Sequence, residues 1–123
     1  MPPRRSLDRL DDIAEACAAV ERFCATADAG KLATDELLVA ALLYQIAVIG
    51  EAAGHLPDAW KRDTPEVPWS EVVTMRNVLI HEYFRVDADV LWQTVRTDIP
   101  QLAAAVATMR EAALSKKGES RDE

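Results

Sequence analysis

The stretch MRNVLIHEYF, residues 75–84, sets four polar side chains with useful chemistry among apolar neighbours: Arg76, Asn77, His81 and Tyr83. A guanidinium offers a planar set of donors to a phosphate and stabilises the negative charge that develops on it. An imidazole takes up and releases a proton near neutral pH. An arginine and a histidine together therefore suit phosphate-ester chemistry without a metal, such as cleavage of RNA through its own 2′-hydroxyl.

Each of these side chains also has an ordinary structural interpretation. A single arginine on an apolar helix usually extends its stem over the surface or pairs with a carboxylate, for which Glu51 and Glu82 are candidates. A single histidine is usually hydrogen-bonded within the fold, and a tyrosine at a helix end usually packs with its hydroxyl in water. Their combination in one short stretch favours a chemical role over three separate coincidences.

Neither a metal site nor a nucleophilic triad finds support in the sequence. The histidines, His55 and His81, and the cysteines, Cys17 and Cys24, lack the spacing of metal ligands. Seven residues of helix span about 10 Å, so the two thiols cannot form a disulfide with each other. We expect both cysteines to be buried and reduced, and we expect the protein to use neither a metal nor another cofactor.

Helices must position the polar stretch, because apolar residues recur at helical spacing and no strand pattern is evident. Four helices are predicted, over residues 6–27, 34–53, 69–83 and 87–113. Ser6 and Thr34 are the expected N-caps of the first two, and Pro100 should kink or split the fourth. The connector, residues 55–68, holds one expected helical turn at 58–62. Amphipathic helices with mostly short connections predict an all-α antiparallel bundle.

Apolar stripes define the expected core. The first helix contributes Leu10, Ile13, Cys17, Val20 and Cys24, and the fourth contributes Leu91, Val95, Ile99, Leu102, Val106 and Met109. Helix 34–53 is apolar nearly all round, so it is either central or covered on a second side by a partner chain. A homodimer is the interpretation we favour, since two copies of Arg76 and His81 in one cleft would supply both a base and an acid.

Composition and charge limit the class of protein. At 123 residues the chain is long enough for one domain with its own core, which we place at residues 1–114, followed by a polar C-terminal tail at 115–123. The most apolar run, residues 37–50, is shorter than the roughly 20 residues of a membrane span, and the charged N-terminus does not resemble a secretory signal. We expect a cytoplasmic protein. The net charge of −7 opposes an extended nucleic-acid-binding surface, so any RNA site must be local.

The motif resembles that of a known family. RNVLIHEY is similar to the Arg-x4-6-His signature of HEPN-domain ribonucleases, in the Arg-x4-His-x-Tyr form of HepT toxins. The segments IGEAAGHLP, PEVPWSEVVTMRNVLIHEYFRVD and LWQTVRTDIPQL also resemble the HepT-like family, in the correct order and spacing, across most of residues 45–102. The motif alone is a weak signal, whereas the long match is specific.

The resemblance implies a HEPN-like four- to five-helix bundle that forms a homodimer with a composite cleft. It also implies a metal-independent ribonuclease toxin, neutralised by an MntA-like nucleotidyltransferase that transfers AMP to the motif tyrosine. Carried over, Arg76 and His81 are the catalytic pair, Asn77 is a supporting polar residue and Tyr83 is the modified residue. Glu51 is a further supporting candidate, with His55 near it, because the second helix could face the cleft.

A second interpretation stays open. The chain could be a non-catalytic HEPN-like module that dimerises and binds the nucleotidyltransferase, with Arg76 and His81 holding a nucleotide or only structure. The acidic composition also predicts that binding of RNA is weak and salt-sensitive, or depends on a recognised shape.

Overall fold

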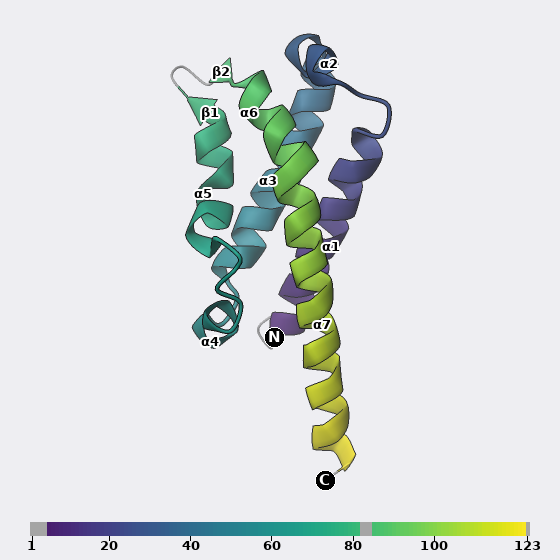
Figure 1. Cartoon of the computed structure of the whole chain (residues 1–123), viewed down its shortest axis with the longest axis vertical. Coiled ribbons are helices and arrows are strands. Elements are labelled where there is room, and N and C mark those ends of the chain that lie inside the picture. The colour runs from purple at the N-terminus through teal and green to yellow at the C-terminus, as the bar shows by residue number, and fades with distance from the viewer. Residues whose placement is uncertain (1–4, 82–84, 123) are drawn as a thin grey trace.

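The chain folds into an all-α bundle, as predicted, in which α5 packs beside α3 and the long α1, α3 and α7 lie together (Figure 1). The computed structural model describes residues 5–81 and 85–122, with side chains for 5–80 and 85–115. The elements are α1 (Ser6–Phe23), α2 (Ala29–Thr34), α3 (Glu36–Gly54), α4 (Asp58–Arg62), α5 (Trp69–Leu79), β1 (Ile80–His81), β2 (Arg85–Val86), α6 (Ala88–Gln93), the π-helix η1 (Thr94–Asp98) and α7 (Ile99–Asp122).

The predicted stripes form the core. Leu10, Ile13, Cys17 and Val20 are buried on α1, and Leu91, Val95, Ile99, Leu102, Val106 and Met109 are buried along α6, η1 and α7. Cys24 is only half-buried, and both cysteines are free. On α3, Leu42, Ile46 and Ile49 are all fully buried. The reason is that α3 is covered by α1 on one side and by α5 on another, so its buried arc is wide.

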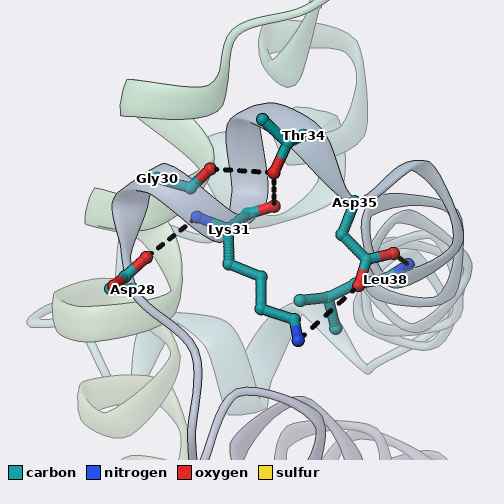
Figure 2. Close-up of polar contacts among 6 residues, drawn as sticks. All are labelled: Asp28, Gly30, Lys31, Thr34, Asp35 and Leu38. Carbon is teal, nitrogen blue, oxygen red and sulfur yellow. Dashed lines mark hydrogen bonds and ion pairs between the residues drawn. The ribbon is translucent and has the colours of Figure 1, made fainter.

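Two aspartates, rather than the predicted threonine, start the helices that follow α1. Figure 2 shows the carboxylate of Asp28 accepting from the Lys31 backbone N–H at 2.8 Å and that of Asp35 accepting from the Leu38 N–H at 3.0 Å. Thr34 instead ends α2, and its hydroxyl donates to the Gly30 carbonyl at 3.2 Å. The prediction of Thr34 as the cap was therefore wrong, because the short helix α2 occupies residues expected to be a turn.

Helix α1 also differs at both ends from the helix predicted over residues 6–27. Ser6 is its first helical residue, and Arg5 is the N-cap, with a backbone N–H that donates to the Asp8 carboxylate at 3.3 Å. The predicted Ser6 cap is thus one residue late. Helix α1 ends at Phe23 and not near residue 27, because the chain turns there to bring Leu32 of α2 into the core.

The predicted helix through residue 83 stops early. Helix α5 begins at Trp69 as expected but ends at Leu79, which is fully buried, and Ile80 adopts extended backbone angles. A short antiparallel pairing follows, with Ile80 opposite Val86 and His81 opposite Arg85. The Asp87 N–H donates to the Leu79 carbonyl at 3.1 Å and closes this hairpin. Residues 82–84 lie outside the described part of the chain.

The predicted disturbance at Pro100 is a π-helical turn. The Ile99 N–H donates to the Thr94 carbonyl, five residues back, immediately before the proline that has no N–H. The Thr94 hydroxyl donates to the Val90 carbonyl at 2.9 Å inside the same turn. One bulged helical column thus runs from α6 through η1 to α7. Helix α7 is held to α1 by an ion pair of 2.7 Å between Arg110 Nε and Asp11 Oδ1.

Helix α3 is the one helix of the described residues long and apolar enough, by length and composition, to cross a membrane. Two observations favour a core helix instead. It packs against α1 and α5, and five of its residues, Leu42, Ile46, Ile49, Ala52 and Ala53, are buried. The turn expected at residues 58–62 is present as α4.

Candidate active site

A polar hollow of about 440 Å³ lies between α3 and α5 and brings together three of the predicted site residues, Glu51, Arg76 and Asn77. Glu51 comes from the last turns of α3, and Arg76 and Asn77 come from the last turn of α5. His55, the residue that caps the end of α3, lines the same hollow. The hollow therefore gathers a cation, an amide, a carboxylate and an imidazole from two helices.

The close approach of the two helices at this point requires a glycine. A Cβ added at Gly50 would lie 2.9 Å from the carbonyl oxygen of Val73, closer than such atoms approach one another. Both residues line the hollow. Gly50 thus lets the backbone of α3 lie against that of α5 and fixes how far Arg76, one turn after Val73, stands from Glu51.

Glu51 pairs with His55 rather than with Arg76. Glu51 Oε1 lies 3.0 Å from His55 Nε2, four residues along α3. Arg76 is exposed, and its guanidinium forms no ion pair or hydrogen bond with the described side chains. The structural alternative in which Glu51 neutralises Arg76 is therefore not what the fold shows. A guanidinium at the mouth of a hollow, with no carboxylate paired to it among these residues, suits an incoming phosphate.

The motif histidine is placed only through its backbone. His81 is the second residue of β1, beyond the end of α5, so Arg76 and His81 do not share one helix as the predicted helix 69–83 required. The side chain of His81 and the whole of Tyr83 lie outside the described residues. The structure thus brings Glu51, Asn77 and Arg76 together and leaves the predicted positions of His81 and Tyr83 as predictions.

A larger hollow on the opposite face of α5 has different chemistry. It encloses about 610 Å³ between α5 and the α6–η1–α7 column, and its lining includes Met75, Val78 and Leu79. Among the described residues, three carboxylates, those of Glu66, Glu71 and Asp98, line it, and no lysine or arginine does. A phosphate would be repelled there, so the smaller hollow with Arg76 is the better candidate for an RNA site.

The cysteines are not candidate nucleophiles. Burial, with a smaller contribution from the Glu21 carboxylate, raises the pKa of Cys17 to about 12. Burial also raises the pKa of Cys24. A thiol is nucleophilic as its thiolate, so both remain unreactive near neutral pH. Among the described side chains, no group of three His, Cys, Asp or Glu residues converges on a possible metal position.

The pairing of His55 with Glu51 was not predicted from the sequence, although the signal was present. Residues four apart on a helix are neighbours on its surface, and the segment GEAAGH places them at that spacing. The segment was used for its resemblance to the HepT-like family, and the contact between Glu51 and His55 was not predicted from it. What the sequence could not provide was the packing of α5 beside it.

Comparison with known proteins identifies the family of this chain. The family model described as "Ribonuclease HepT-like" matches residues 13–109. The chain belongs to the HepT-like ribonuclease family. A protein of Thermococcus cleftensis named "Probable ribonuclease HepT" is 40% identical over 108 residues, which is 88% of this chain and 98% of that protein. The recognition made from the motif and its flanking segments is therefore confirmed.

More distant HepT-like relatives cover similar lengths. "Putative RNase MJ1380" of Methanocaldococcus jannaschii is 33% identical over 97 residues, 79% of this chain and 89% of that protein. No solved structure matches the chain significantly. The matched range includes α3, α5 and the hairpin, so the candidate hollow lies within the part that defines the family.

Proposed function

We propose that this HepT-like chain is the toxin of a toxin–antitoxin pair, a cytoplasmic ribonuclease that cleaves RNA without a metal. The observation that carries the proposal is the hollow between α3 and α5, where Arg76 stands beside Asn77 with no carboxylate paired to it among the described residues. Arg76 would bind the scissile phosphate and His81 would transfer a proton. An arginine supplies the positive charge and a histidine the proton transfer, so the reaction needs no Lewis acid.

A second copy of the chain would complete the site. On α3, Leu37 and Tyr44 are 83% and 68% exposed, which is unusual for large apolar side chains. They lie seven residues apart, and Glu51 follows after seven more, so all three share one face of the helix. That face runs directly into the hollow. We propose that a two-fold partner covers Leu37 and Tyr44 and places its own Arg76 near that of the first protomer.

Neutralisation would act through Tyr83. Transfer of AMP to its hydroxyl by an MntA-like nucleotidyltransferase would add a phosphate and a nucleoside two residues from His81 in the sequence. The added negative charge would repel the RNA phosphate, and the nucleoside would block its access. The net charge of −7 means that RNA binding already depends on a few local contacts, which makes this block effective.

Co-expression tests the proposal. Cells expressing the wild-type chain should stop growing, and Arg76→Ala or His81→Ala should relieve the toxicity. Arg22→Ala, which removes an exposed arginine from α1, is the matched control and should stay toxic. Intact mass and peptide mapping of residues 77–85 after co-expression with the nucleotidyltransferase should show AMP on Tyr83. Equal toxicity of the Arg76 and His81 variants would contradict a ribonuclease toxin.

The alternative is a non-catalytic module that dimerises and binds the nucleotidyltransferase. It predicts a stoichiometric complex with no mass added to Tyr83 and no loss of RNA in cells. The hollow favours the enzyme over this alternative, because it gathers a guanidinium, an amide, a carboxylate and an imidazole from two helices.

A further inference from the structure

His55 lies in the same hollow as Arg76 but is no part of the Arg-x4-His-x-Tyr motif. It is the residue at the C-terminal end of α3, and its side chain is 53% exposed at the mouth of the hollow. His55 and Arg76 are both exposed to solvent and both line this hollow. The proposed function gives it no role.

The contact with Glu51 determines which ring nitrogen of His55 can accept a proton from a substrate. A carboxylate accepts hydrogen bonds and cannot donate them, so the 3.0 Å contact requires the proton on Nε2. In the neutral ring, Nδ1 then carries the lone pair and can accept a proton. When Nδ1 does so, the adjacent Glu51 carboxylate stabilises the imidazolium that forms. A carboxylate holds a catalytic imidazole in the same way in hydrolytic triads.

We infer that His55, oriented by Glu51, is the general base of the ribonuclease reaction. The inference rests on the proposed function. Nδ1 of His55 takes the proton from the 2′-hydroxyl, and the 2′-oxygen forms a bond to phosphorus. The bond from phosphorus to the 5′-oxygen breaks, and that oxygen receives a proton from His81, the acid. The products are a 2′,3′-cyclic phosphate and a free 5′-hydroxyl, and Arg76 stabilises the charge on the phosphate oxygens throughout.

This assignment changes what the second protomer is needed for. With only His81, the base and the acid must come from two copies of the chain. With His55 as base, each protomer holds its own proton acceptor on α3 beside its own Arg76 on α5. Dimerisation would then cover the exposed face of α3 and exclude water, and would not have to supply a missing histidine.

Two substrates distinguish the role of the general base, His55, from that of the general acid, His81. One is an oligoribonucleotide, and the other is a uridine 3′-phosphodiester with a p-nitrophenolate leaving group, which departs without protonation. His55→Gln should lower kcat/KM by about 100-fold or more on both substrates, the usual contribution of a general base. His81→Ala should lose activity on RNA and keep most of it on the nitrophenyl ester. Glu51→Gln, which leaves an amide beside Nε2, should cost less than His55→Gln.

Controls keep the result interpretable. Glu36→Gln removes an exposed carboxylate from the first turn of the same helix and should leave both rates unchanged. Circular dichroism should show that every variant keeps the helical fold, and added imidazole should restore part of the activity of His55→Ala. A His55→Gln enzyme with wild-type rates on both substrates, while Arg76→Ala is inactive, would overturn the role of His55. A folded wild-type protein inactive on both substrates would instead overturn the proposed function itself.

Discussion

The backbone of Gly50 on α3 lies so close to the carbonyl oxygen of Val73 on α5 that a Cβ would be only 2.9 Å from it. This contact sets the distance between the helix that carries Glu51 and His55 and the helix that carries Arg76. It links one small residue of the packing to the geometry of the whole candidate site.

Replacing Gly50 by alanine should therefore disturb both stability and activity. The added methyl must push α3 and α5 apart, because the atom it meets is backbone and cannot rotate away. Overpacking of this kind costs about 1–3 kcal/mol, which urea denaturation would measure. Gly54→Ala on the same helix meets no atom within 4 Å and should be neutral or stabilising by up to about 1 kcal/mol. Equal effects of the two substitutions would argue against a close approach at Gly50.

The positive charge of Arg76 alone should not be enough for full ribonuclease activity. Lysine keeps the positive charge but loses the planar fork of donors that fits a phosphate. We expect Arg76→Lys to retain the fold and to cleave RNA at least about 100-fold more slowly, since one lost donor to a developing oxyanion costs about 100-fold or more. Steady-state kinetics on a fluorescent oligoribonucleotide would measure this. A fully active lysine variant would reduce the role of Arg76 to electrostatic attraction.

The affinity for RNA should fall only slowly as the salt concentration rises. The acidic chain offers few basic contacts, and each contact to a single-stranded phosphate contributes about −0.7 to the slope of log K against log salt. A composite cleft with one Arg76 from each protomer therefore predicts a slope between about −1 and −3. Fluorescence anisotropy with the inactive His81→Ala variant would give it. A slope several times steeper would point to an extended basic surface that the composition does not show.

The exposed apolar face of α3 should control the oligomeric state. Leu37→Asp combined with Tyr44→Asp places two charges on a surface that is open in the single chain, so folding should be preserved. Sedimentation velocity should show a dimer for the wild type and a monomer for this variant. Leu114→Asp, half-exposed on α7, is the control and should stay dimeric. A dimer that survives both charges would place the interface elsewhere.

Cys17 should make the fold sensitive to alkaline pH. Its pKa in the folded chain is about 12, against 9.0 for a free thiol. Below pH 9 the thiol is protonated in both states and has no effect. Above it, the unfolded chain loses a proton that the folded chain keeps, so stability falls as pH rises towards 12, by at most about 1.4 kcal/mol per pH unit. Urea denaturation at pH 8, 9 and 10 should show a smaller slope for Cys17→Ala than for the wild type.

Much of this fold follows from the sequence, because helical periodicity identifies buried faces directly. The stripes of α1 and α7 were predicted for that reason, whereas α4, which buries no residue, was predicted only as one turn of the connector. Helix caps were harder to predict where two neighbouring residues could both serve as the cap. Thr34 and Asp35 are adjacent and both can cap a helix, and only the existence of α2 assigns Thr34 to its end.

The candidate site was predictable in its residues but not in its geometry. Residues 75–84 read as one continuous helix, yet burial of Leu79 and the pairing of Ile80 with Val86 end α5 before His81. That pairing depends on residues after the motif, which no helical pattern reveals. The partnership of Glu51 with His55, which leaves Arg76 without a carboxylate partner among the described residues, likewise depends on how α3 meets α5.

We propose that the hollow holding Arg76 is the active site and that the protein cleaves RNA there without a metal. The most direct measurement is cleavage of an oligoribonucleotide by the purified wild-type protein in excess EDTA, beside Arg76→Ala and Arg22→Ala. We expect equal rates with and without EDTA for the wild type, unchanged activity for Arg22→Ala and a loss of about 100-fold or more for Arg76→Ala. Cleavage that survives Arg76→Ala, or that stops when EDTA is added, would contradict it.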